Sequence, residues 1–196
     1  SLVDFPLCPE CEAEYADPSN RRFHAEAIAC PRCGPQLRAC SSDGTTIVES
    51  HEAINAAVAM LNAGNIVAVH AAGGFQLWVD ATRSDAVARL RERKHRDAKP
   101  FAVMVRDLGD AERLGDLSEI EMELLASAAA PIVLVKGLVD SPLAAEVAPG
   151  CSTVGLCLPA SPLQMLLCKQ FGRPVVATSG NLSDEPLCFE PAEAIE

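Results

Sequence analysis

The chain has 196 residues, enough for one domain of ordinary size with a small appended module but too few for several full domains. Hydrophobic residues make up 49% and charged residues 22%, which excludes a wholly disordered chain, and the net charge of −11 argues against broad, non-specific nucleic-acid binding. No apolar run approaches the roughly 20 residues of a membrane helix, and the N-terminus shows no secretory signal. We therefore expect a cytoplasmic protein without membrane contacts. Because the chain does not begin with Met, we expect it to be a piece of a longer protein.

Residues 1–39 contain two C-x2-C pairs, Cys8 with Cys11 and Cys30 with Cys33, separated by eighteen residues. Two such turns can aim four thiolates at one tetrahedral zinc ion. The segment holds few large apolar side chains, so the metal has to supply its folding free energy. Two redox pairs or two coincidental turns are the alternatives, but the spacing favours one structural zinc ion whose four ligands leave no open position for catalysis.

The other five cysteines show no ligand spacing, and no His that could serve as a base lies near any of them in the sequence. A small buried hydrophobe is the expected role of the one in the apolar run near residue 165. The sequence assigns no role to the rest of this group: Cys40, Cys151, Cys157, Cys168 and Cys188.

Residues 40–50 form a polar connector, and beyond it short strand and helix signals alternate. Ser50 caps a predicted helix that runs to about Ala63, with Gly64 as its stop. Further helices are predicted at about 84–95, 108–114, 118–129 and 161–170. Runs rich in β-branched residues predict strands at 66–69, 75–79, 101–105, 132–135, 154–158 and 174–178. Residues 51–196 therefore predict an α/β domain with a mixed sheet and flanking helices.

A basic cluster lies between Arg89 and Lys99, where six basic residues outnumber two acidic ones. For Arg89 and Arg91 we favour a solvated helix face with internal ion pairs. Lys94, Arg96 and Lys99 instead converge on the turn before an apolar strand, where cations can fix a polyphosphate.

Small polar residues follow the last predicted strand, at Thr178, Ser179, Gly180 and Asn181. Such a turn lets backbone N–H groups and side chains approach phosphate or ribose oxygens, although an ordinary Asn/Ser turn explains it equally well. Gly73 and Gly74 offer a further close approach, or simply a hairpin. Neither G-x-x-x-x-G-K-[ST] nor G-x-G-x-x-G occurs, so a nucleotide would bind by another scheme.

The cysteine pairs, the basic cluster and the small polar turn occur in the same order as in HypF-type carbamoyltransferases, which are hydrogenase maturation proteins, and the chain resembles that family. The Cys8-Pro9-Glu10-Cys11 and Cys30-Pro31-Arg32-Cys33-Gly34 motifs resemble the second zinc finger of that family. In that family a YrdC-like domain follows the finger. Residues 73–75, 80–82 and 90–104 resemble parts of this domain, as do Thr178-Ser179-Gly180-Asn181 and Asp184-Glu185-Pro186.

The resemblance implies a twisted mixed sheet of the YrdC type and the formation of carbamoyl-adenylate from ATP, with Mg²⁺, and a carbamoyl unit derived from carbamoyl phosphate or carbamate. A later domain of the family, absent here, passes the carbamoyl group to the partner HypE as a precursor of the cyanide ligand of the nickel–iron site. The catalytic residues would be Lys94 and Arg96. The nucleotide would be bound by Lys99, Ser179, Asn181, Gly74 and Thr178.

Three positions depart from the family pattern: His70 replaces a usual Lys, and Gln76 and Gln164 each replace a usual His. One alternative is a threonylcarbamoyladenylate synthase, but those enzymes lack the zinc finger and carry an Arg where this chain has Cys157. Another is a double-stranded-RNA-binding module that uses the patch at 89–99, which the net charge disfavours. A third is an intact domain that is inactive without its flanking domains.

Overall fold

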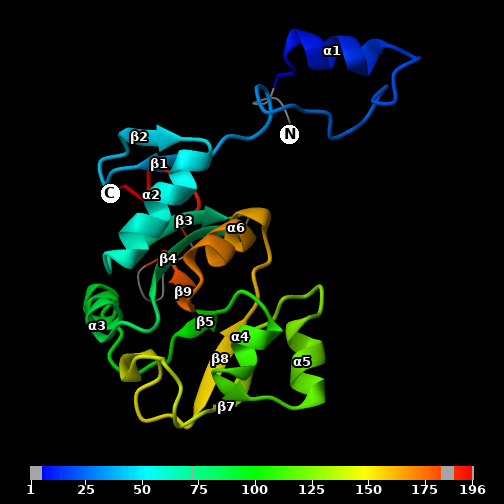
Figure 1. Ribbon diagram of the computed structural model, residues 1–196. Coiled ribbons are helices and arrows are strands. Elements are labelled where there is room, and N and C mark those ends of the chain that lie inside the picture. The colour runs from blue at the N-terminus through cyan, green and yellow to red at the C-terminus, as the bar shows by residue number, and fades with distance from the viewer. Residues whose placement is uncertain (1–5, 72, 182–187, 196) are drawn as a thin grey trace.

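The computed structural model describes residues 6–71, 73–181 and 188–195, so the Asp184-Glu185-Pro186 part of the second motif lies outside the described residues. Figure 1 shows a small N-terminal module at one end and a larger α/β body. Within the described residues, no helix is long and apolar enough to cross a membrane.

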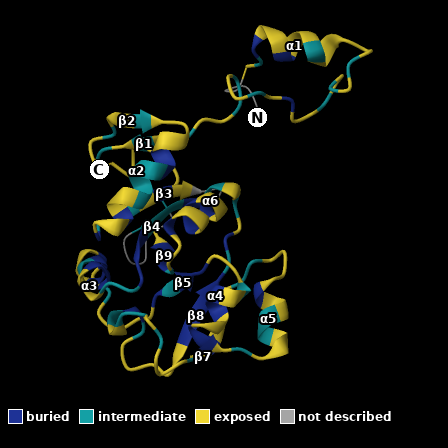
Figure 2. Cartoon of the chain, viewed as in Figure 1, coloured by how far each residue is buried: buried dark blue, intermediate teal, exposed yellow. Residues whose placement is uncertain are grey.

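The N-terminal module contains one helix, α1 (Pro9–Ala16), followed by turns up to residue 36. Figure 2 shows this module mostly exposed. Among residues 6–36 the buried ones are Cys8, Cys11 and Ile28. So small an apolar cluster cannot offset the entropy of ordering about 30 residues, as expected for a segment stapled by metal.

The segment over 40–50, expected as a polar connector, instead contributes to an antiparallel ribbon. Strands β1 (Arg38–Cys40) and β2 (Thr46–Glu49) pair through a turn in which Gly44 adopts a φ of 82°. The ribbon packs on helix α2 (His51–Asn62), and Leu37 packs against the core beneath it. The ribbon therefore belongs to the body rather than to a free linker.

The body is built on a seven-stranded sheet with the order β3-β4-β9-β5-β8-β7-β6. The β5–β8 pair is parallel and the other pairs are antiparallel. The predicted mixed sheet is thus confirmed. Its strands are β3 (Val67–Ala71), β4 (Gly74–Asp80), β5 (Ala102–Met104), β6 (Gly115–Asp116), β7 (Val133–Gly137), β8 (Thr153–Cys157) and β9 (Val175–Ser179).

Helices cover both faces of the sheet, because alternate side chains of each strand point to opposite faces. One face carries Val79, Val103 and Leu156 and packs against helix α3 (Ser84–Arg93) and its neighbours. The other face carries Trp78 and Met104 under helix α2 and helix α6 (Pro162–Phe171). The other described helical segments are α4 (Leu108–Glu112), α5 (Glu119–Leu125) and η1 (Ala145–Val147).

Two helix ends matter for the site. Helix α3, predicted to run to about residue 95, stops at Arg93 because His95 adopts a left-handed φ of 48°. Helix α6 begins with a capping box, in which Ser161 Oγ accepts from the backbone N–H of Gln164 and Gln164 Oε1 accepts from the backbone N–H of Ser161. These two ends lie on opposite faces of the sheet.

A candidate metal centre and a candidate phosphate-binding junction

Four cysteine sulfurs meet in the N-terminal module. The Sγ atoms of Cys8, Cys11, Cys30 and Cys33 lie within 4.8 Å of one another. Cys8 Sγ is 3.7 Å from Cys30 Sγ, which is 3.8 Å from Cys33 Sγ. Zn–S bonds of about 2.3 Å in a tetrahedron separate the sulfurs by about 3.8 Å. The donor set therefore fits a structural zinc ion, as predicted.

The pKa values of these thiols are shifted in opposite directions by their surroundings. Hydrogen bonds from the backbone at Cys8 and Cys30 lower the pKa of Cys33 to about 6. Burial and the neighbouring thiols raise the pKa of Cys11 to about 12. Arg22 braces the site, pairing with Glu14 at 2.7 Å and donating to Ala29 O at 2.8 Å. A metal ion that binds here has to displace protons from the buried thiols.

The second site joins the end of α3 to the end of β9. Lys94, only 7% exposed, donates from Nζ to the carbonyl oxygens of Ser179 at 2.6 Å and Asn181 at 2.9 Å. These contacts bring a cation and the small-residue turn together across 85 residues of sequence. Burial and the nearby Arg96 guanidinium lower the pKa of Lys94. Two donated hydrogen bonds leave the ammonium a third N–H for an anion.

Arg96 lies beside Lys94 and is fixed on several sides. Its Nε donates to Lys99 O at 3.0 Å and its Nη2 to Pro100 O, while Nη1 lies 3.4 Å from Thr178 Oγ1. The guanidinium also stacks 4.7 Å above the Phe101 ring. The Lys99 side chain is exposed, and Lys99 contacts Arg96 through its backbone carbonyl oxygen. Two cations so close together form a potential anion site.

Arg91 is the residue that sequence reasoning misjudged, because it is 8% exposed rather than solvated. Its guanidinium donates to Arg96 O at 2.7 Å, Lys99 O at 3.2 Å and Val147 O at 3.1 Å, and also to Glu146 O. It thereby shapes the loop that carries Arg96. The spacing in the sequence could have predicted this burial, because Arg91 lies four residues after the buried Val87 and therefore on the same face of the helix.

Gly73 and Gly74 lie at the β3–β4 hairpin, where Gly74 pairs with Ala71. Gly180 N donates to Phe75 O at 2.7 Å, and a Cβ at Gly180 would lie 2.9 Å from the Phe75 backbone oxygen. Glycine at 180 therefore allows the turn to approach β4 closely. Thr178 and Ser179 side chains lie on opposite faces of the sheet, with Ser179 exposed.

Two of the three positions that depart from the family pattern meet in space. Gln164 Nε2 donates to Gln76 Oε1 at 3.1 Å, although 88 residues separate them. The third, His70, stacks on Phe75 with ring centroids 4.4 Å apart and faces the edge of Phe189. The site thus contains an amide pair and an aromatic stack at these positions.

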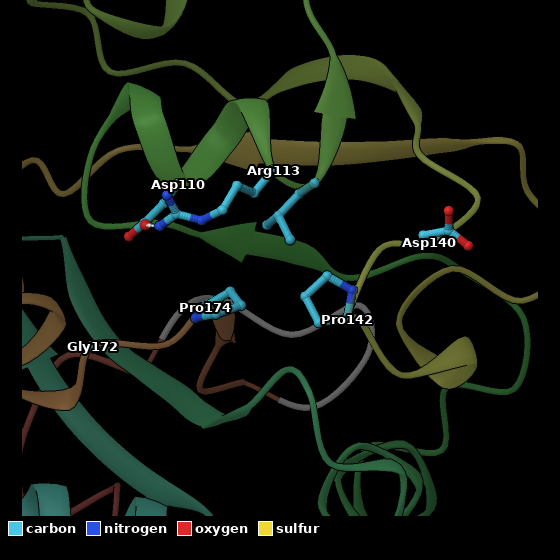
Figure 3. Close-up of a pocket in the computed structure, with 7 residues that line it drawn as sticks. Asp110, Arg113, Asp140, Pro142, Gly172 and Pro174 are labelled. Carbon is cyan, nitrogen blue, oxygen red and sulfur yellow. Dashed lines mark hydrogen bonds and ion pairs between the residues drawn. The ribbon is translucent and has the colours of Figure 1, made fainter.

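Two cavities lie away from this junction. The one in Figure 3, of about 340 Å³, is lined by Asp110, Arg113, Pro142 and Pro174, and in it the carboxylate of Asp110 pairs with Arg113. Pro174 precedes β9, so this cavity lies at the opposite end of the strand from Ser179. The other, of about 460 Å³, lies between β7 and the loop before β8. Neither includes any of the predicted site residues.

Comparison with known proteins places the chain in a family. Residues 59–196 match the profile of the Sua5/YciO/YrdC family, described as telomere recombination. The chain belongs to the Sua5/YciO/YrdC family. Residues 7–40 match the HypF finger, so the YrdC-like domain follows that finger as the resemblance predicted.

Relatives with the same combination are much longer. Carbamoyltransferase HypF of Rhodobacter capsulatus is 45% identical over 196 residues, which is 100% of this chain and 26% of that protein. Carbamoyltransferase HypF of a Synechocystis species is 47% identical, covering 99% of this chain and 32% of that protein. A crystal structure of full-length HypF in the phosphate- and nucleotide-bound form superposes with a TM-score of 0.82 at 40% identity, covering 99% of this chain and 25% of that one. The YrdC-like chain described here thus spans about a quarter to a third of these relatives.

Proposed function

We propose that the YrdC-like domain of this chain binds ATP with Mg²⁺ and forms carbamoyl-adenylate, as the carbamoyl-activating part of a HypF-type carbamoyltransferase. The observation that carries the proposal is the contact of Lys94 Nζ with the Ser179 and Asn181 carbonyls, with Arg96 beside it. The HypF relatives and the bound phosphate and nucleotide named for one of them support the same chemistry.

In the proposed reaction, a carboxylate oxygen of carbamate attacks the α-phosphorus of ATP. A new P–O bond forms, the bond from the α-phosphorus to the bridging oxygen of the β-phosphate breaks, and pyrophosphate leaves with the electron pair. Negative charge moves onto the departing pyrophosphate, so cations stabilise the transition state without a covalent nucleophile. We assign this role to Lys94 and Arg96, with Mg²⁺, and we assign nucleotide contacts to Ser179, Asn181, Thr178, Gly74 and Lys99.

The later steps belong to the longer protein. Transfer of the carbamoyl group to HypE, on the way to a cyanide ligand, would use regions that lie outside the quarter to a third of the HypF relatives matched here. In this proposal, zinc has no part in the chemistry, because its four thiolate ligands fill the tetrahedral shell. Its role is to fold the finger.

ATP–pyrophosphate exchange tests the proposal with the 196-residue chain. Carbamate, supplied as ammonium with bicarbonate, should support exchange, and ATP with Mg²⁺ should raise the unfolding temperature. Exchange that instead depends on threonine with bicarbonate would identify a threonylcarbamoyladenylate synthase. Absence of both exchange and ATP-dependent stabilisation would refute the adenylation proposal. Salt-sensitive binding of double-stranded RNA without nucleotide binding would favour an RNA-binding module.

A further inference from the structure

A chain of fixed amide groups runs from the start of α6 to β4. Gln164, only 4% exposed, accepts at Oε1 from the backbone N–H groups of Ala160 at 2.9 Å and Ser161 at 3.0 Å. Only an oxygen can accept from backbone N–H groups, so the orientation of this amide is determined by its neighbours. Its nitrogen must therefore face Gln76.

The orientation of Gln76 follows in the same way. Its Oε1 accepts from Gln164 Nε2 at 3.1 Å and from Trp78 Nε1, also at 3.1 Å. Indole nitrogen is a donor only, so both neighbours require oxygen at this position. The planar amide then directs the two N–H groups of Gln76 away from Gln164 and Trp78.

Gln76 lies next to the candidate junction. It pairs in register with Ser179, whose side chain lies on the same face of the sheet, and the Ser179 carbonyl oxygen binds Lys94. Directly opposed residues on adjacent antiparallel strands have Cβ atoms about 5 Å apart. Gln76 itself is half-buried. An oriented, neutral hydrogen-bond donor therefore lies on the strand next to Ser179, whose carbonyl oxygen holds Lys94.

We propose that Gln76 Nε2 is a specificity-determining donor to the carbamate, binding the carboxylate oxygen that does not attack ATP, and that Gln164 and Trp78 are positioning residues for it. This inference rests on the proposed function. Lys94 and Arg96 supply the charge that phosphates need, whereas a neutral donor suits the oxygen that stays with the carbamoyl group as its charge falls from carboxylate to carbonyl. Its action should therefore appear in the carbamate KM and leave ATP binding unchanged.

Gln76→Met tests this, because Met has a similar length but no donor. We expect the KM for carbamate in ATP–pyrophosphate exchange to rise about tenfold, the worth of one hydrogen bond, while ATP still raises the unfolding temperature as in the unsubstituted chain. Gln164→Met should raise the same KM by less, because Trp78 still holds the Gln76 oxygen. Gln170→Met is the matched control on the same helix, since its exposed amide binds Asn55 instead.

The outcomes separate the two proposals. If the unsubstituted chain catalyses exchange and Gln76→Met keeps the same carbamate KM, the inference about Gln76 is wrong and the proposed function stands. If Gln76→Met also abolishes ATP-dependent stabilisation, Gln76 serves the nucleotide, which likewise overturns the inference. If the unsubstituted chain shows neither exchange nor ATP-dependent stabilisation, both proposals fail. Far-ultraviolet circular dichroism of each variant checks that its fold is retained.

Discussion

The junction between Lys94 and the turn after β9 makes a sharp prediction for Lys94→Met, which keeps the apolar stem and removes the ammonium. The variant loses two hydrogen bonds, to Ser179 O and Asn181 O. Each bond to a charged group contributes about 1.5–3 kcal/mol, but Met also avoids the cost of burying the ammonium. We therefore expect a net loss of about 2 kcal/mol.

For a chain of this size, 1 kcal/mol corresponds to about 2–4 °C in the unfolding temperature, so Lys94→Met should unfold about 4–8 °C lower. The variant should also lose the stabilisation by ATP with Mg²⁺, because the cation proposed to hold the phosphates is gone. Differential scanning fluorimetry with and without ATP measures both effects.

Arg89→Met is the matched control. Arg89 is on the helix that precedes Lys94 and also donates to a backbone carbonyl, but that carbonyl belongs to Gly64, and among the described residues Arg89 has no hydrogen bond to the turn after β9. This control should unfold at a slightly lower temperature and keep the full ATP-dependent shift. If ATP stabilises Lys94→Met as strongly as it stabilises Arg89→Met, the nucleotide site has been assigned to the wrong place.

Further predictions concern the metal, the buried arginine and pH. Cys8→Ser should reduce bound zinc from about one ion per chain to none by elemental analysis and disorder only the finger, whose small core is separate from those of the sheet; unchanged zinc would contradict the assignment. Arg91→Met removes hydrogen bonds to four carbonyls and should cost about 3 kcal/mol, or about 6–12 °C in thermal melts; an unchanged melt would mean that these contacts contribute nothing. The pKa of Lys94 is lowered in the fold, so between that value and the 10.5 of the unfolded chain the unfolded state binds more protons, and this group's contribution to stability rises with pH. ATP-dependent stabilisation, which needs the ammonium, should decline over the same range, and a shift that stays constant up to pH 10.5 would argue against Lys94 as the phosphate ligand.

Some features follow from the sequence because they depend on local spacing. Two C-x2-C turns predicted the sulfur cluster, since three-residue spacing brings paired thiols together wherever the turn occurs. The alternating apolar runs predicted the mixed sheet, because burial of one strand face depends on neighbours two residues apart. Helix ends and the ribbon over 38–49 were less well predicted, since they depend on single φ values, such as those at His95 and Gly44, and on packing against α2.

The sequence by itself thus determined the four-cysteine cluster, the α/β class and the composition of the two segments proposed to bind phosphate. Only the tertiary structure decided that Lys94 reaches the turn after β9, that Arg91 is buried beneath the loop that carries Arg96, and that Gln76 and Gln164 orient one another. The longer of these contacts join residues 55 to 88 positions apart. Their formation depends on strand order and on which face each helix covers, and no periodicity within one segment encodes either.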